Sequence, residues 1–150
     1  MYAEVNRGRY FQSIMVCCVL GAAASGLALQ HHYRRDSSSF CNFNATFNCD
    51  VVNRSAYSEV AGIPVALGGL AAYLLMLGLC VFQRKKSETP ALLLLLGVAG
   101  VVFSLYLTYV EAEVLRTWCV LCLTSLGSIA AIAILSAWQV WCESHGARQL

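Results

Sequence analysis

The chain has 150 residues, of which 59% are hydrophobic and only 12% are charged, and its formal net charge is +2. This composition is too apolar for an ordinary soluble domain, and no basic stripe indicates nucleic-acid binding. The length is that of one domain, so residues 1–150 are treated as a single unit.

The charged residues are clustered, and long stretches between the clusters carry none. Each stretch has the roughly 17–25 residues that cross a bilayer as an α-helix. The sequence therefore predicts an all-α membrane protein in which four antiparallel transmembrane helices form a bundle. The predicted spans are about 11–30, 62–82, 91–110 and 118–141.

A basic N-terminal segment precedes the first span, which is also typical of a signal peptide. The run Ala22 to Ala24 could imitate a cleavage site. Because the apolar run continues past it to Leu29, we expect a retained helix. Cys17 and Cys18 lie inside this span and are interpreted as packing residues.

The first connection is the longest polar segment, and in it Cys41 and Cys49 are separated by seven residues. Residues 55–61 could form a short amphipathic helix on the membrane surface. His31 and His32 are expected to be solvated at the interface.

Two prolines mark the beginnings of the next helices. Pro64 and Pro90 are expected in the first turn, where the N–H that proline lacks would be unpaired anyway. Thr89 is the expected cap of the third helix. The connection before the fourth span has only about half a dozen residues, which predicts that the third and fourth helices are antiparallel neighbours.

Four spans place both termini and the 83–89 connection on one side of the membrane. That side carries six basic residues, including the cluster Arg84, Lys85 and Lys86, against four on the other side. Because basic residues are enriched in cytoplasmic connections, residues 30–61 are predicted to face the outside, where disulfides persist.

The fourth span opens on Trp118-Cys119-Val120-Leu121-Cys122. Two cysteines three apart lie on one face of a helix, one turn apart. With Thr117 as the predicted N-cap, Cys119 falls in the first turn, where unpaired N–H groups and the helix dipole favour a thiolate. This pattern is typical of a redox-active dithiol, although two cysteines in an apolar helix can also be simple packing residues.

The predicted topology places the two cysteine pairs at the same outer surface of the membrane. A pair in a loop beside a pair at a helix start can exchange disulfides through a mixed disulfide. A zinc site is less favoured because seven intervening residues exceed the usual ligand spacing, and we expect no metal. Two structural disulfides are also less favoured, since a bridge within one helical turn closes almost no loop. The residues concerned are Cys41, Cys49, Cys119 and Cys122.

Several motifs in this order resemble the vitamin K epoxide reductase family in its prokaryotic, disulfide-forming branch. They are Cys41, Cys49-Asp50-Val51-Val52-Asn53-Arg54-Ser55-Ala56-Tyr57, Gly62-Ile63-Pro64, Ser104-Leu105-Tyr106-Leu107-Thr108-Tyr109-Val110-Glu111 and Trp118-Cys119-Val120-Leu121-Cys122. The resemblance implies a four-helix bundle around a quinone, with an extracytoplasmic loop or short helix capping the active site.

In that family pattern Cys119 and Cys122 are the active-site pair, and Cys122 faces the quinone. Cys41 and Cys49 are the shuttle pair, in which Cys49 reaches Cys119 and Cys41 meets the outside partner. Ser55 matches a family serine near the quinone, although a helix cap is an equally good interpretation.

Val65 and Leu126 stand where animal members that reduce the vitamin epoxide carry asparagine and tyrosine. Because neither side chain can bind an epoxide oxygen, this departure favours a quinone as the oxidant. The seven-residue shuttle spacing nevertheless resembles the animal enzymes. An animal-type epoxide reductase and a non-enzymatic four-span protein with structural disulfides are therefore the alternatives.

The resemblance thus implies a membrane thiol oxidoreductase that passes electrons from a thioredoxin-like dithiol to a quinone of the ubiquinone, menaquinone or vitamin K type. The partner is expected to be a separate periplasmic or lumenal chain, since the sequence ends at Leu150. The expected location is a bacterial inner membrane, with the active site on the extracytoplasmic side.

Overall fold

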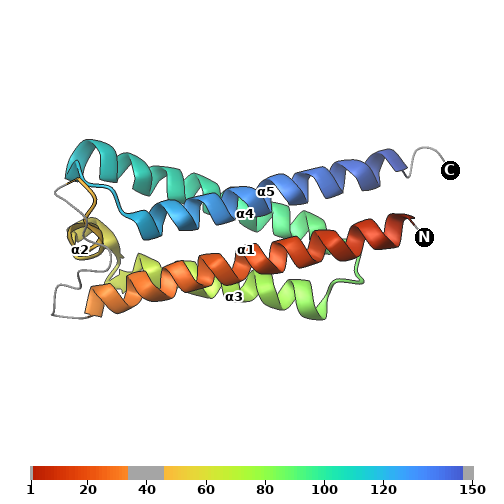
Figure 1. Cartoon of the computed structure of the whole chain (residues 1–150), viewed down its shortest axis with the longest axis horizontal. Coiled ribbons are helices and arrows are strands. Elements are labelled where there is room, and N and C mark those ends of the chain that lie inside the picture. The colour runs from red at the N-terminus through yellow and green to blue at the C-terminus, as the bar shows by residue number, and fades with distance from the viewer. Residues whose placement is uncertain (1, 34–45, 147–150) are drawn as a thin grey trace.

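The computed structural model describes residues 2–33 and 46–146. Four long helices run along its length: α1 (Tyr2–Tyr33), α3 (Val65–Phe82), α4 (Thr89–Tyr109) and α5 (Val120–Gly146) (Figure 1). By length and composition, all four are able to cross a membrane. The predicted all-α, four-span architecture is confirmed.

The bundle is held together by an apolar core. Helix α1 packs against α3 and α5, and α5 also packs against α4, whereas α3 and α4 touch each other only slightly. Fully buried side chains from each helix meet in the core: Ile14, Met76, Leu93 and Ile132. Cys18 and Cys80 are free and buried in the same core, as expected for packing residues.

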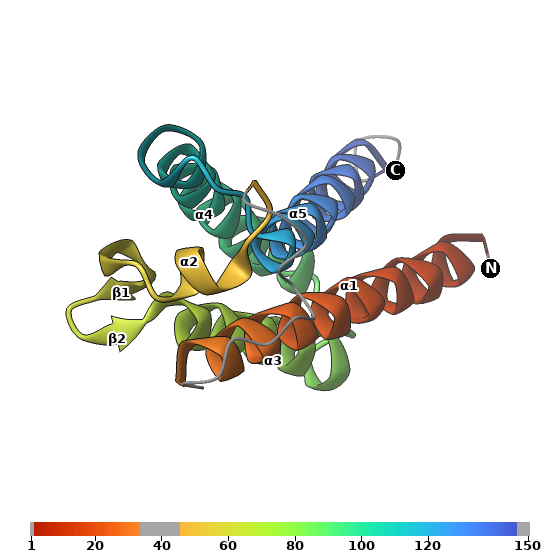
Figure 2. The same ribbon diagram turned by 60° about the vertical axis from the view of Figure 1, so that its left-hand side comes forward.

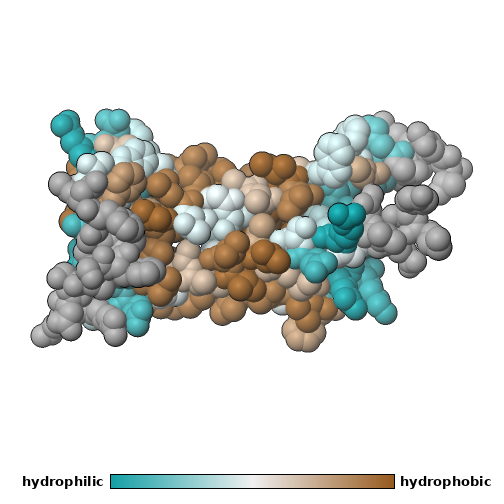
Figure 3. Space-filling view, viewed as in Figure 1, coloured by the Kyte–Doolittle hydropathy of each residue, from teal (hydrophilic) through white to brown (hydrophobic). Residues whose placement is uncertain are grey.

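The outside of the bundle is apolar as well. Leu95 and Ile134 are 67% and 69% exposed, far more than large aliphatic side chains in a protein core. On the face shown in Figure 3, hydrophobic residues occupy much of the middle of the molecule and hydrophilic residues gather toward both ends. Such a surface suits a lipid environment, where the bilayer takes the place of water.

The two ends of the bundle differ in what they carry. Both termini and the α3–α4 connection lie at one end, where Arg7 Nη2 donates a 2.8 Å hydrogen bond to the carbonyl of Lys86 (Figure 1). The opposite end carries a small cap between the long helices, shown in Figure 2. The cap contains helix α2 (Cys49–Asn53), the 3₁₀ turn η1 (Ala56–Ser58) and the hairpin of β1 (Glu59–Val60) and β2 (Ile63–Pro64).

The helices extend beyond most of the predicted limits. Helix α1 begins at Tyr2 rather than near residue 11, and α4 continues as the π-helix η2 (Val110–Leu115). Charged residues do not interrupt backbone hydrogen bonding, so the end of a charge-free run does not mark the end of a helix. Helix α3 instead begins late, at Val65, because Ile63 and Pro64 pair with β1.

The predicted surface helix over 55–61 was wrong, because that segment forms the turn η1 and the hairpin. The short helix lies earlier, at Cys49–Asn53. Its N-cap is Asn48, whose Oδ1 accepts the backbone N–H groups of Asp50 at 3.1 Å and Val51 at 3.2 Å. An asparagine side chain satisfies two N–H groups that the first turn leaves unpaired.

The expected positions of two helix starts also change. Pro64 occupies the N-cap position of α3 rather than its first turn. Thr89 is the first residue of α4, and its hydroxyl donates to the carbonyl of Gln83 at 2.6 Å instead of capping the helix. This bond ties the start of α4 to the end of α3.

Candidate active site

Cys119 occupies the N-cap position of α5, because the helix begins at Val120. Its Sγ accepts the backbone N–H of Cys122 at 3.3 Å, as a capping serine oxygen would. Thr117 was therefore wrongly predicted as the cap, and its hydroxyl donates to the carbonyl of Leu115. The cap moves to Cys119 because the neighbouring Trp118 is held in an extended bridge with Phe47.

The surroundings of Cys119 favour its thiolate. Its pKa is lowered mainly by a hydrogen bond from the Cys122 side chain, and the backbone N–H groups of Cys122 and Leu121 lower it further. Burial of the sulfur and the nearby Glu111 act in the opposite direction. Both cysteines are free in this structure, so the pair is in its dithiol form.

Glu111 is a site residue to which our sequence reasoning assigned no role. It is only 2% exposed, and its Oε2 accepts the backbone N–H of Cys119 at 3.0 Å. One carboxylate oxygen and the sulfurs of Cys119 and Cys122 lie within 4.8 Å of one another. An acidic residue at the end of an apolar span, shortly before a Cys-x-x-Cys motif, was the signal available in the sequence.

The π-helix η2 positions this glutamate. The carbonyl of Glu111 accepts the N–H of Thr117 at 3.1 Å and also that of Arg116, which has a left-handed backbone (φ 51°). The chain therefore turns sharply after η2 and returns past Glu111 to Cys119. Single π-turns within helices are frequent at functional sites.

The first connection is joined to the motif by backbone hydrogen bonds. Trp118 N–H donates to the carbonyl of Thr46 at 2.8 Å, and Asn48 N–H donates to that of Trp118 at 3.2 Å. Helix α2 follows at once and buries Cys49 completely, in one apolar cluster with Cys119. The structure thus brings together two cysteines that lie far apart in the sequence.

Cys49 is disulfide-bonded in the structure, whereas six other cysteines are free. A zinc site built from the same four thiolates would need Cys49 in its reduced form. Cys41, the remaining predicted site residue of the first connection, lies outside the described residues.

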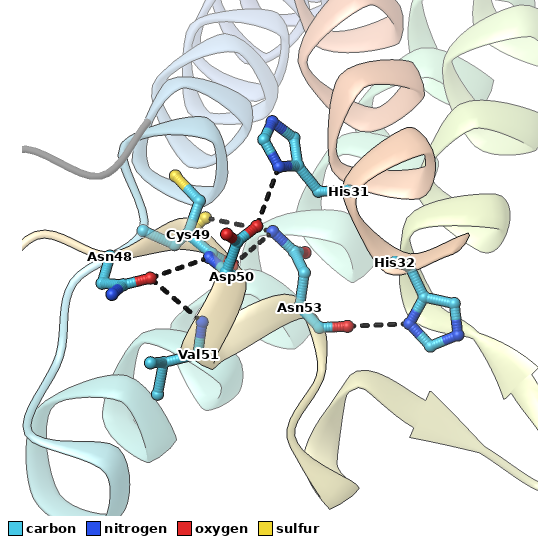
Figure 4. Close-up of polar contacts among 8 residues, drawn as sticks. His31, His32, Asn48, Cys49, Asp50, Val51 and Asn53 are labelled. Carbon is cyan, nitrogen blue, oxygen red and sulfur yellow. Dashed lines mark hydrogen bonds and ion pairs between the residues drawn. The ribbon is translucent and has the colours of Figure 1, made fainter. Parts of the chain in front are cut away.

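Polar contacts fasten α2 to its neighbours, as Figure 4 shows. Asn53 Nδ2 donates to the carbonyl of Cys49 at 2.9 Å and lies 3.8 Å from Cys119 Sγ, where it makes a weaker hydrogen bond. His31 Nδ1 lies 3.0 Å from Asp50 Oδ1, and both side chains are buried. His32 contacts the carbonyl of Asn53 through Nδ1 at 2.7 Å.

The expectation that the two histidines are solvated was therefore wrong. The second ring nitrogen of His32 also lies 3.1 Å from the Glu59 carboxylate, which joins α1 to the hairpin. The reason is the length of α1, whose last turn continues beyond the apolar run to Tyr33 and reaches the cap. His31 thus links α1 to helix α2, and His32 links α1 to both α2 and the hairpin.

A cavity of about 440 Å³ opens beside the dithiol, and all four long helices contribute to its walls. This volume is within the usual range for small-molecule sites. Cys122, Ser55 and Val65 line it, and Val52, Tyr57 and Val60 cover it from the cap. Ser55 occupies the N-cap position of η1 but makes no capping hydrogen bond, and its hydroxyl donates to the carbonyl of Val52 at 2.8 Å instead.

Leu126 lies elsewhere, packed against the main apolar core. Most residues of the cavity wall are apolar. Among the polar ones, Tyr73 donates its hydroxyl to the carbonyl of Ser125 at 2.7 Å. The cavity therefore suits an apolar ring with a small number of polar atoms.

The four-span helical bundle thus holds a dithiol beside a mostly apolar cavity, an arrangement that suits a membrane oxidoreductase. A protein-family model described as "Vitamin K epoxide reductase family" matches residues 12–137 of the chain. The protein belongs to this family, as its cysteine motifs indicated. Members of the family generally act with a quinone.

Proposed function

We propose that this protein oxidises the dithiol of a thioredoxin-like partner and passes the two electrons to a quinone, in support of disulfide-bond formation. The observation that carries the proposal is the placement of Cys49 against Cys119 in one buried cluster, with Cys122 in the wall of the cavity. The sulfurs of Cys49, Cys119 and Cys122 would thus carry electrons from the cap of the bundle to the cavity.

The loop pair receives the electrons first. We propose Cys41 as the disulfide partner of Cys49, because the resemblance to the family implies that these two cysteines are the shuttle pair. The partner's thiolate attacks Cys41, and the Cys49 thiolate so released attacks Cys119. Each step exchanges one disulfide for another and needs no additional oxidant.

The active pair then passes the electrons on. With Cys49 oxidised and Cys119 and Cys122 as thiols, the structure corresponds to the point at which the active pair holds two electrons. The lowered pKa of Cys119 favours its thiolate, which would form the bond to Cys122 as two electrons pass to the quinone.

The cavity fits a quinone ring, because its wall is mostly apolar and carries the Cys122 side chain. A bound quinone would accept two electrons and two protons and leave as the quinol. Cys122 would contact the ring, Val65 and Ser55 would lie beside it, and the cap would exclude water. The slight contact between α3 and α4 offers a route from the lipid.

Quinone is the proposed acceptor in preference to the vitamin epoxide. Val65 lines the cavity with a side chain that cannot donate a hydrogen bond, and Leu126 is packed against the main core, away from the cavity wall. Without polar groups from these two positions, an epoxide oxygen has less to bind. Supplying vitamin K epoxide in place of quinone tests this choice, and turnover at the quinone rate would contradict it.

We place the cap on the extracytoplasmic side of a bacterial inner membrane, facing a separate partner chain. The end of the bundle that holds both termini also carries the basic cluster Arg84, Lys85 and Lys86, as cytoplasmic ends usually do. Labelling of single cysteines introduced at positions 57 and 85 from either side of the membrane tests the orientation.

The central experiment measures quinone-dependent oxidation of a thioredoxin-like dithiol by the purified protein in detergent or vesicles. Cys122→Ala should abolish turnover, because the sulfur in the cavity wall is lost. Cys142→Ala is the matched control, since Cys142 is free and exposed near the far end of α5. If Cys122→Ala turned over at the wild-type rate, the proposed electron path would be wrong.

A further inference from the structure

Glu111 carries a polar atom with no evident structural purpose. Its Oε1 is buried, and among the described residues it has no hydrogen-bond partner. Oε2 is accounted for by the N–H of Cys119. A buried polar group without a partner is costly, so native proteins retain few of them outside functional sites.

The position of this carboxyl group points to its use. Glu111 lines the same cavity as Cys122, and a carboxylate oxygen lies within 4.8 Å of the Cys122 sulfur. It therefore lies beside both a thiol that must lose its proton and the cavity in which the acceptor gains one. The described residues give Glu111 no ion pair that would hold it permanently charged.

We propose that Glu111 is the proton relay between the Cys122 thiol and the acceptor in the cavity. This inference rests on the proposed function, in which that acceptor is a quinone. It supplies the acid–base group that the two cysteines lack.

The chemistry balances with this relay. Exchange with Cys49 releases Cys122 as a thiolate, which takes up one of the two protons that the partner's dithiol gives up. The active pair then consists of the Cys119 thiolate and the Cys122 thiol. Forming the Cys119–Cys122 bond breaks the S–H bond of Cys122 and releases two electrons to the quinone. The Cys122 proton passes to the Glu111 carboxylate and then to one oxygen of the reduced acceptor, and water supplies the second proton.

Two other ionisable side chains that line the cavity are engaged elsewhere. His32 contacts the carbonyl of Asn53 and the carboxylate of Glu59, and the hydroxyl of Tyr73 donates to the carbonyl of Ser125. Cys119 and Cys122 come from the start of α5, and Cys49, from α2, is disulfide-bonded and does not titrate. Asp50 of the same helix faces His31. Glu113, two residues further along η2, is exposed.

The decisive variant is Glu111→Gln, because glutamine keeps an oxygen that can accept the N–H of Cys119 but cannot carry the proton. The relay predicts that its quinone-linked turnover falls by about 10²-fold or more, the usual contribution of general acid–base catalysis. Glu113→Gln is the matched control and should retain wild-type turnover. If Glu111 were only structural, Glu111→Gln would match wild type and Glu111→Leu alone would be impaired.

Two measurements on quinone-free protein separate the relay from the proposed function. In a Cys119→Ala background, alkylation of Cys122 should depend on pH in two steps when Glu111 is present and in one step in Glu111→Gln, since interacting groups titrate jointly. Redox-difference infrared spectra should show a carboxyl band on reduction of the wild-type protein. This band should be absent in Glu111→Gln and unchanged in Glu113→Gln.

The infrared measurement on wild-type protein requires no variant to fold. Absence of a carboxyl band there, or identical Cys122 titration with and without Glu111, would overturn the relay. Failure of the proposed function gives a different result, in which the wild-type protein does not reduce quinone although the Glu111-dependent band and titration are present.

Discussion

The sulfur of Cys119 caps helix α5 by accepting the backbone N–H of Cys122 at 3.3 Å. The same sulfur thus satisfies one of the N–H groups that the first turn of α5 leaves unpaired, and it is also the proposed nucleophile. The two roles can be separated, because serine is among the best N-cap residues and has no sulfur chemistry.

We therefore expect Cys119→Ser to abolish electron transfer while keeping most of the helix stability. Cys119→Ala should lose the cap as well, at a cost of about 1 kcal/mol in the free energy of unfolding. Thermal unfolding in detergent measures the difference between the two variants. Equal stability of serine and alanine at this position would show that the sulfur does not cap the helix.

The lowered pKa of Cys119 predicts a pH dependence with a definite sign. The thiolate is present above the folded-state pKa, so Cys119 should remain reactive at pH values below the ordinary cysteine pKa of about 8.5. Any stability that the thiolate contributes is complete above the unfolded-state pKa and is lost as the pH falls through the folded-state pKa. The rate of Cys119 alkylation against pH measures the position of this transition.

The largest cause of the lowered Cys119 pKa is the hydrogen bond from the Cys122 side chain, and a substitution can remove it selectively. Cys122→Ala deletes the hydrogen bond that its side chain donates to Cys119 and should move the alkylation profile to higher pH. Cys122→Ser keeps a donor and should move it less. A profile that does not change in Cys122→Ala would assign the shift to the backbone N–H groups alone.

The contact between His31 and Asp50 holds the cap against α1. Replacing His31 by alanine leaves the buried Asp50 carboxylate without this hydrogen bond. The docked state of α2 should lose on the order of 2 kcal/mol, which is typical of a hydrogen bond to a charged group. Hydrogen exchange over residues 46–64 should become faster and the exchange between Cys49 and Cys119 slower.

The control for this prediction is Val51→Ala on the same helix, because Val51 is 46% exposed and lies outside the apolar cluster that holds Cys49. Wild-type exchange rates in His31→Ala would mean that other contacts alone hold the cap.

Close packing of α4 and α5 depends on a glycine. A Cβ atom at Gly97 would lie 3.1 Å from Cα and 3.2 Å from the backbone nitrogen of Ala133, and a backbone cannot move aside easily. Gly97→Ala should therefore destabilise the bundle by about 1–3 kcal/mol through overpacking. Gly78→Ala on α3, where a Cβ would meet nothing within 4 Å, should be neutral or slightly stabilising. Thermal unfolding of both variants in detergent measures the contrast, and equal effects would contradict this interpretation.

Much of the architecture could be predicted from local properties of the sequence. Apolar runs long enough to cross a bilayer defined the four spans, and the order of the cysteine motifs indicated the family that the comparison confirmed. The helix limits were less predictable. A charge-free run indicates which residues can lie in lipid, but the helix itself can extend further. Helix α1 continues to Tyr33 because its last turn binds the cap.

The sequence by itself determined the membrane class and the number of spans and indicated the family, because hydrophobicity and cysteine spacing are properties of short segments. Only the tertiary structure placed Cys49 against Cys119, moved the helix cap to the Cys119 sulfur and brought the Glu111 carboxyl group to the dithiol. These relationships join residues from different elements. They arise from the sharp turn after the π-helix and from the backbone bridge between Phe47 and Trp118, neither of which has a recognisable pattern in the sequence.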